Sequence, residues 1–302
     1  MNLTVIIPTR NRSKLLNTLV TNLAINFNHI DQIIIVDSSD NMDKNVRFSD
    51  FKNVLHVHTK IKSAAIQRNI GLDLVKSNCK FVSFLDDDVN PPPNYFTQLT
   101  NLLMSQKAVG VSGIAENPKS LNLKKINQIF HAYRNFFFLD SNDQGKVLNS
   151  GVNIPVNKSL TGKSITESQW LIGCAIWDFQ KIKSLRFDNR FSGQSLGEDV
   201  LFSLKASKYG KLFVKQNLIL THFESSTNRP NYLMYTRMWV RNRFYIVEEI
   251  LGDKMKISYH WCNFGRFLTL IFFAPRYPIN FLFGLTGIYL GYYDLVKDRN
   301  AR

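Results

Sequence analysis

The stretch that decides the fold is Phe81-Val82-Ser83-Phe84-Leu85-Asp86-Asp87-Asp88, where mostly apolar residues run directly into three carboxylates. A short, nearly continuous apolar run predicts a strand that is buried on both faces, as in a parallel sheet. Isolated carboxylates are too costly to bury, so the three acids are expected to emerge at the carboxyl edge of that sheet. Open α/β sheets bind their ligands at this edge.

Carboxylate oxygens gathered at one strand end suit Mg²⁺ or Mn²⁺, which usually arrive with the phosphates of a substrate. The alternative is a solvated acidic turn, which Asn90 and Pro91-Pro92-Pro93 immediately downstream also favour. The run by itself leaves both interpretations open.

The composition describes a folded, basic protein. The chain has 302 residues, of which 44% are hydrophobic, so it can form one large domain or two smaller ones. Its net charge of +15 predicts affinity for polyanions. The sequence lacks a nucleic-acid-binding motif or a dense Lys/Arg arm, so we expect phosphorylated substrates or anionic lipid and no nucleic acid.

The amino-terminal stretch and the cysteines predict a cytoplasmic protein. The apolar run Leu3–Ile7 is too short for a signal peptide and lacks a basic leader. Cys79, Cys174 and Cys262 are far apart, which is typical of reduced thiols rather than of disulfides or a metal site.

The first part of the chain predicts a βαβ unit. Leu3–Ile7, ended by Pro8, and Gln32–Val36 read as strands with a helix between them, and the Phe81 strand follows later. Their ends would gather Arg10, Asp37 and the acidic cluster at one edge. A carboxylate for a base or ribose, a cation for phosphate and acids for a metal together suit a nucleotide. Alternatively, Arg10 and Arg12 are surface residues and Asp37 forms a turn.

Four segments carry a resemblance to a known family. Residues 5–12, 35–37, 67–71 and 84–88 together resemble the family-2 glycosyltransferases. An Arg-Asn-Arg helix at residues 241–243 is similar to that of rhamnosyltransferase-like members, which build bacterial surface polysaccharides. The resemblance implies a GT-A fold, an α/β architecture with a Rossmann-like, mixed but mostly parallel sheet flanked by helices. It also implies a nucleotide-sugar donor and a Mn²⁺ or Mg²⁺ ion.

The resemblance assigns roles to the strand ends. It implies that Asp37 contacts the base or ribose and that Arg68 lies near the base or diphosphate, although Ser38 stands where many members carry a second acid. Asp88 would ligate the metal, and Asp86 or Asp87 would hold the ribose or assist. The candidate nucleotide-sugar-binding residues are Thr9, Arg10, Asp37, Arg68, Asp86 and Asp87, and the candidate metal ligands are Asp88, Asp86 and His222.

A second acidic site lies at Glu198-Asp199, which opens a predicted helix. Acids at a helix start also simply complement its dipole. The glycine-containing lead-in resembles the acceptor-side motif of the family, which implies Asp199 as catalytic base and Glu198 as second candidate. A sugar hydroxyl needs a positioned proton acceptor, so one carboxylate and one metal suffice for a single inverting displacement.

The remainder predicts a helical tail. The apolar runs Phe267–Ala274 and Ile279–Tyr293 are shorter than the ~20 residues of a spanning helix, so we expect them to lie in a membrane interface. A buried hairpin and an oligomer contact are the alternatives. The cations of the helix at 232–250 would reach a diphosphate or a lipid headgroup, or form a solvated face. The predicted domains are a glycosyltransferase domain at 1–225, with a nucleotide-sugar half (1–112) and an acceptor half (113–225), and a tail at 226–302.

The sequence thus predicts an inverting, metal-dependent glycosyltransferase of hexosyltransferase type. Its acceptor would be a hydroxyl of a lipid-linked glycan or polysaccharide, and it would associate peripherally with the inner face of the cell membrane. A sugar nucleotidyltransferase is one alternative, but it normally has a glycine-rich loop after the first strand, where this chain has Pro8-Thr9-Arg10-Asn11-Arg12. A non-catalytic, membrane-associated nucleotide-sugar-binding protein is the other, and an oligomer remains open.

Overall fold

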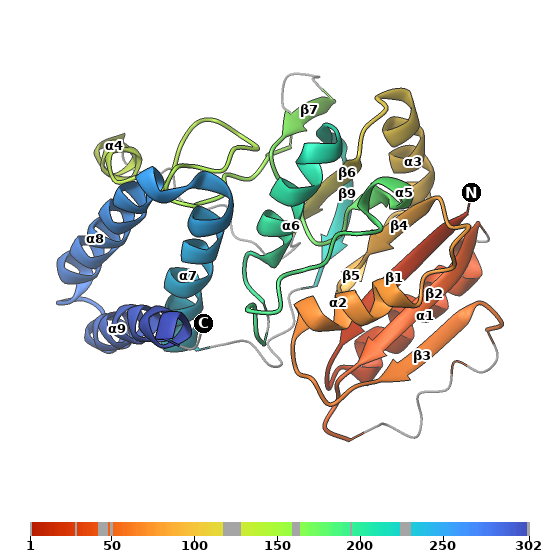
Figure 1. Cartoon of the computed structure of the whole chain (residues 1–302), viewed down its shortest axis with the longest axis horizontal. Coiled ribbons are helices and arrows are strands. Elements are labelled where there is room, and N and C mark those ends of the chain that lie inside the picture. Colours follow the sequence, from red (N-terminus) through yellow and green to blue (C-terminus); the bar gives the residue numbers. More distant parts are fainter. Residues whose placement is uncertain are drawn as a thin grey trace.

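The computed structural model describes residues 2–27, 29–41, 48, 51–116, 128–158, 164–193, 195–223 and 231–300. In these residues one mixed sheet carries helices on both faces, and a group of helices from the end of the chain stands beside it (Figure 1). In spatial order the strands are β3 (Val54–His58), β2 (Ile30–Asp37), β1 (Leu3–Thr9), β4 (Phe81–Phe84), β8 (Ile176–Asp178), β6 (Gly110–Glu116), β9 (Leu212–His222) and β5 (Val89–Asn90), while β7 (Ile165–Ser168) pairs with β9.

The helices fall into those that cover the sheet and those of the tail. The first group is α1 (Ser13–Asn26), α2 (Ala64–Asp73), α3 (Tyr95–Ser105), α5 (Phe179–Ile182) and α6 (Glu198–Ala206). The second is α7 (Tyr232–Ile246), which continues as a π-helix (Val247–Leu251), α8 (Lys256–Phe273) and α9 (Pro278–Asn300), with α4 (Gln128–Phe136) packed against α8. Short 3₁₀ turns occupy Ser207–Tyr209 and Asp253–Met255.

The nucleotide half is built from four parallel strands in the order β3-β2-β1-β4. Because side chains alternate along a strand, Val5 and Ile7 pack in the core beneath α1 and α3, while Ile6 packs on the opposite face with α2. The chain adds β2 and β3 on one side of β1 and then β4 on the other. This reversal leaves a crevice at the carboxyl ends of β1 and β4, where such sheets bind ligands.

The prediction that Pro8 ends the first strand is wrong. β1 continues to Thr9, with Pro8 opposite Val36 of β2. The pairing of β1 with β4 ends at Ile6, so the missing N–H of the proline breaks no ladder on that side.

The second half of the sheet mixes directions. β8 runs antiparallel to β4 and β6, whereas β6 and β9 are parallel. The apolar runs predicted as separate strands at 212–214 and 218–220 form one strand, β9. Of the predicted run at 169–177, only residues 176 and 177 lie in a strand, β8. The predicted division at residue 112 falls inside β6, and the predicted boundary at 225/226 lies outside the described residues. The predicted fold class, a mixed α/β sheet with C-terminal helices, is confirmed.

The tail packs closely on itself and on the sheet domain. Gly287 and Gly291 of α9 face α7, and a Cβ atom at Gly287 would lie 2.7 Å from the carbonyl oxygen of Leu233. Asp294 of α9 forms an ion pair with Arg237 at 2.7 Å. The buried apolar side chains of α7 share one core cluster with those of α6. In the described part of the chain, no helix is both long and apolar enough to cross a membrane.

Candidate active site

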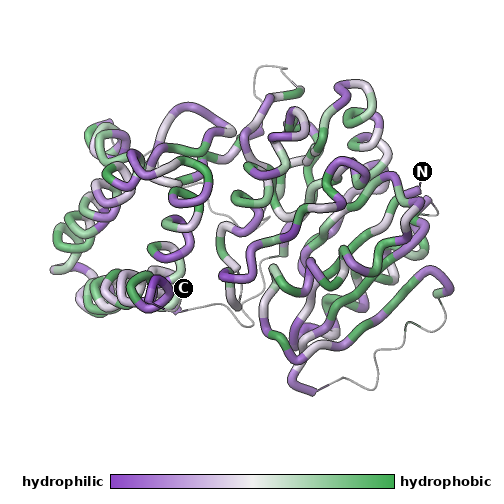
Figure 2. Tube along the Cα trace, viewed as in Figure 1, coloured by the Kyte–Doolittle hydropathy of each residue, from purple (hydrophilic) through white to green (hydrophobic). Residues whose placement is uncertain are grey.

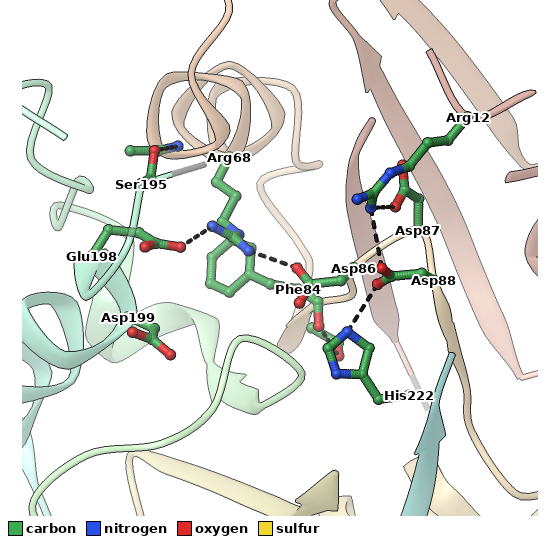
Figure 3. Close-up of polar contacts among 12 residues, drawn as sticks. Arg12, Arg68, Phe84, Asp86, Asp87, Asp88, Ser195, Glu198, Asp199 and His222 are labelled. Carbon is green, nitrogen blue, oxygen red and sulfur yellow. Dashed lines mark hydrogen bonds and ion pairs between the residues drawn. The ribbon is translucent and has the colours of Figure 1, made fainter. Parts of the chain in front are cut away.

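The three acids after β4 point in different directions. Asp87 turns toward β1, where its carboxylate accepts hydrogen bonds from the Thr9 hydroxyl and from the Arg12 guanidinium, both at 2.7 Å. Arg12 also reaches Asp88 at 3.1 Å. Figure 3 shows Arg12 bridging these two carboxylates, with Asp86 on the other side of Asp88. The middle acid therefore fixes the loop, while all three acids line the strand-end cavity described below.

Strand pairing brings a histidine to this cluster from 134 residues away. The short strand β5 pairs antiparallel with the end of β9, which sets Val89 opposite His222. The Nε2 atom of His222 consequently lies 3.1 Å from an oxygen of Asp88. One potential ligand atom each from Asp86, Asp88 and His222 lie within 4.8 Å of one another. Oxygen ligands with one imidazole suit Mn²⁺ or Mg²⁺, so this predicted ligand set fits such an ion.

Arg68 of α2 links the strand ends to the second acidic site. Its buried guanidinium donates to Glu198 and, at 2.8 Å, to Asp86 (Figure 3). The helix begins after Ser63, whose hydroxyl accepts the amide of Ile66. The backbone of Gly173 lies close by, and a Cβ atom there would be 3.3 Å from the Arg68 guanidinium. The Arg68 guanidinium is thus held by Glu198, by Asp86 and by the backbone at Gly173.

The two acids at the start of α6 have different surroundings. Gly197 precedes them with a φ of +87°, a left-handed conformation that glycine adopts without strain. Glu198 is buried against Arg68, whereas Asp199 lies apart from that chain in Figure 3. The hydrogen bond described for the Asp199 carboxylate comes from the backbone amide of Val200 in its own helix. Asp199 lines a cavity and keeps capacity to accept a proton.

Burial raises the pKa of these carboxyl groups. It raises the pKa of Asp199 to about 6 and that of Glu198 to about 8, although the positive charge of Arg68 opposes both shifts. Burial also raises the pKa of Asp87 to about 6, against the lowering effect of Arg12.

Two cavities meet at Asp86 and His222. The strand-end cavity, of about 800 Å³, is lined by the ends of β1, β2 and β4 and includes Thr9, Arg12 and Arg68. The helix-side cavity, of about 670 Å³, lies between Asp199 and the helices α7 and α8. Asp86 and His222 line both, so a group held at the acidic cluster is accessible from either side.

Most of the predicted site residues come together, and Asp37 stands apart. Asp37 is buried and accepts hydrogen bonds from the Ser39 amide at 2.8 Å and from His56 at 3.3 Å. Burial alone would raise the pKa of Asp37, but these bonds outweigh it and hold the pKa below the usual value. Its neighbour Ser38 lines the strand-end cavity, as does Arg10, which pairs with Asp40 at 3.0 Å.

Further arginines, which were not among the candidate site residues, line the two cavities. Arg12 lay in a quoted segment but was weighed only as a surface residue, whereas it holds two of the three acids. Arg243 lay in the predicted Arg-Asn-Arg helix, and Arg266 carried no local signal. Both line the helix-side cavity because α7 and α8 pack next to α6.

Solved structures share this fold at low sequence identity. A crystal structure of residues 1–349 of S. aureus TarS in complex with UDP-GlcNAc superposes with a TM-score of 0.54 at 14% identity, covering 87% of this chain and 71% of that chain. The corresponding complex with UDP gives a TM-score of 0.51 at 15% identity, with 83% and 71% covered. GalNAc-T7 with UDP, GalNAc and Mn²⁺ gives 0.56 at 13% identity, with 87% and 54% covered. The predicted GT-A fold is confirmed.

A comparison with curated protein sequences gives no match. A family model, described as glycosyl transferase family 2, matches residues 4–162, which is more than half of the chain. The match includes the end of β1, α2 and the three acids after β4, all of which line the strand-end cavity. The protein therefore belongs to glycosyl transferase family 2 and is an enzyme that transfers a sugar from a nucleotide-sugar donor.

Proposed function

We propose that this enzyme transfers a sugar with inversion from a nucleoside-diphosphate sugar to a hydroxyl of a lipid-linked glycan or polysaccharide, with Asp199 as general base. The observation that carries the proposal is the position of Asp199 in the helix-side cavity, beyond the Asp86 and His222 side chains that line both cavities. A donor in one cavity and an acceptor in the other would then react at their junction.

The donor nucleotide is assigned to the strand-end cavity, at the topological switch point of the sheet. Thr9, Arg10, Arg68, Asp86 and Asp87 are the proposed donor-binding residues, and Asp37 supports the floor beside Ser38. Uridine diphosphate is the first nucleotide to test, because TarS and GalNAc-T7 share the fold and their structures contain UDP. The rhamnosyltransferase-like resemblance remains a hypothesis about the sugar.

Asp86, Asp88 and His222 would hold Mn²⁺ or Mg²⁺. When bound, the ion offsets the charge that develops on the leaving diphosphate. Arg12 and Arg68 add fixed positive charge next to it, and their carboxylate partners keep both guanidinium groups in place without reorganisation.

Asp199 is favoured as the base over Glu198. Glu198 is held in an ion pair with Arg68, whereas Asp199 accepts only a backbone amide among the described residues and lines the cavity. A general base must lie within reach of the proton that it removes, and geometry decides before pKa. Asp199 would accept the proton of the acceptor hydroxyl while the diphosphate leaves on the other side of the sugar.

The test is Asp199→Asn, measured as UDP release from a panel of UDP-hexoses with Mn²⁺. A general base contributes roughly 10²–10⁴-fold in rate, so kcat should fall within that range. Binding of UDP with Mn²⁺ should be unchanged, since Asp199 lies in the other cavity. Release at a near wild-type rate would show that Asp199 is not the base. Release from no donor by the wild type would refute the assignment of the donor class.

The tail is proposed to contact an anionic membrane surface. Phe272, Ile279 and Leu282, around the turn between α8 and α9, are 75%, 65% and 59% exposed, and Arg276 lies in the turn itself. Hydrophobic residues recur along both helices (Figure 2). Apolar and aromatic side chains beside a cation favour the headgroup region of anionic lipid.

Sedimentation with vesicles tests this contact. The wild type should bind vesicles with about 30% anionic lipid more strongly than neutral ones, since each cation near such a surface contributes about 1 kcal/mol. Phe272→Ser/Leu282→Ser should lose most of the binding. Failure of the wild type to bind, together with a concentration-dependent dimer that the double variant abolishes, would instead identify an oligomer contact.

A further inference from the structure

Two arginines in the helix-side cavity have no acidic partner among the residues that the structure describes. Arg243 of α7 donates to neutral groups: the backbone oxygens of Trp239 and Ser150, the Cys262 sulfur and the Asn263 side chain. Arg266 of α8 donates to the Thr236 hydroxyl at 3.1 Å, and its buried Nε atom lacks a hydrogen-bond partner. The cavity therefore contains positive charge that no ion pair among the described residues neutralises.

Both guanidinium groups lie against the same indole. The Arg243 and Arg266 groups are 3.3 and 4.4 Å from the centre of the Trp239 ring. Stacking offsets part of the cost of bringing two cations together, but it does not supply the counter-charge that buried cations need. Burial and the neighbouring Arg243 lower the pKa of Arg266, which reflects the unfavourable surroundings of an uncompensated charge.

Apart from the proposed base Asp199 and from His222, the other charged groups that line the cavity are already paired. Arg134 pairs with Asp140 at 3.2 Å, and Asp86 pairs with Arg68. An arginine has five N–H donors, of which Arg243 uses four in the bonds described and Arg266 one. Arg266 is therefore the residue with donors left for a ligand, and Arg243 adds a fixed charge behind it.

We infer that Arg266, supported by Arg243 and Trp239, binds a phosphate or diphosphate group of the acceptor. Guanidinium groups match phosphate oxygens in geometry and charge. The same helix ends at the exposed apolar turn, and Phe272 lies about 9 Å along α8 from Arg266 at 1.5 Å per residue. A lipid phosphate held at the proposed membrane surface would therefore lie close to Arg266. This inference rests on the proposed function, since it names the acceptor class for the same site.

The experiment is calorimetric titration of the full-length enzyme, saturated with UDP and Mn²⁺, with geranyl diphosphate. Two matched probes serve as controls. Geraniol has the isoprenoid chain without phosphate, and inorganic diphosphate has the phosphates without the chain. The wild type should bind geranyl diphosphate best, and Arg266→Gln should weaken this binding by about tenfold or more, the usual effect of losing a charge-assisted hydrogen bond. Arg266→Lys should restore part of the affinity. Lys254→Gln, which removes an exposed charge in the turn before α8, should have no effect.

Each outcome has a distinct meaning. Equal affinity in the wild type and Arg266→Gln would overturn the role of the arginine. Binding of geraniol as tight as that of geranyl diphosphate would overturn the phosphate assignment, and equally tight binding of inorganic diphosphate would overturn the lipid source. UDP with Mn²⁺ should bind equally to the wild type and to Arg266→Gln. A failure of that donor binding in the wild type would count against the proposed function itself.

Discussion

The two cavities on either side of Asp86 differ in whether their cationic side chains are paired with carboxylates. In the strand-end cavity the lining cations are paired with carboxylates: Arg10 and Lys62 with Asp40, Arg12 with Asp87 and Asp88, and Arg68 with Asp86 and Glu198. In the helix-side cavity Arg134 is paired with Asp140, but Arg243 and Arg266 have neutral partners. The first arrangement fixes a site before its ligand arrives, and the second leaves a charge for the ligand to neutralise.

The largest effect on stability is expected from breaking the ion pair of Arg68 with Glu198 in the strand-end cavity. Arg68→Met would leave the buried Glu198 carboxylate without its partner, and removing one member of a buried ion pair typically costs about 3–5 kcal/mol. Urea unfolding should show this loss. The double variant Arg68→Met/Glu198→Gln should recover much of the stability because the unpaired Glu198 charge is removed as well. An unchanged unfolding midpoint in the single variant would show that the pair does not stabilise the fold.

The effect at the contact between α9 and α7, the helix that lines the helix-side cavity, should be next in size. Gly287→Leu would force side-chain atoms into the Leu233 carbonyl and Thr236, and such overpacking typically costs about 1–3 kcal/mol. Thr286→Leu, at the exposed neighbouring position, is the control and should leave the thermal midpoint nearly unchanged. Similar midpoints for the two variants would argue against close packing at this contact.

The pH dependence of kcat/KM compares the two acids of α6. Asp199 must be ionised to act as a base, and its pKa is about 6, so kcat/KM should be level above that pH and fall tenfold per unit below it. The residual activity of Asp199→Asn should lack this limb. A limb near pH 8 would instead point to Glu198, whose pKa is raised to about 8.

The smallest effect on stability is expected from removing the charge of Arg266 in the helix-side cavity. Arg266→Gln loses a hydrogen bond to Thr236 and a contact with Trp239, but it also removes an uncompensated cation. The thermal midpoint should therefore stay the same or rise. A drop as large as that of Arg68→Met would mean that Arg266 is structural, and the contrast between the cavities would disappear.

The sequence predicted the strand-end half well because its signals are local. The apolar run before Asp86 marks a buried strand, and parallel strands bring their carboxyl ends together wherever they fall in the chain. The ligand set of Asp86, Asp88 and His222 was predicted, although the reason for its proximity, the pairing of Val89 with His222, is a long-range contact. The family resemblance supplied that long-range link.

The rest depends on contacts that leave no local pattern. Glu198, one of the two partners of Arg68, is 130 residues away in the chain. The sequence around either residue therefore gives no indication of this ion pair. Asp87 turns inward because of Thr9 and Arg12, which a row of three identical acids does not reveal. Arg266 lies in an amphipathic helix, where an arginine is normally expected to be solvated. Only the packing of α8 beside α7 places it in a cavity.

The central claim is that the strand-end cavity binds a nucleoside diphosphate with a metal held by Asp88. Thermal unfolding with UDP, dTDP or GDP, each with and without Mn²⁺, tests it most directly. A ligand at 100 times its dissociation constant stabilises by about 2.7 kcal/mol, which is a shift of several degrees. We expect a shift with one nucleotide that requires Mn²⁺, disappears in Asp88→Asn and persists in Asp199→Asn and Arg266→Gln. A shift that survives in Asp88→Asn, or the absence of a shift with every nucleotide, would contradict it.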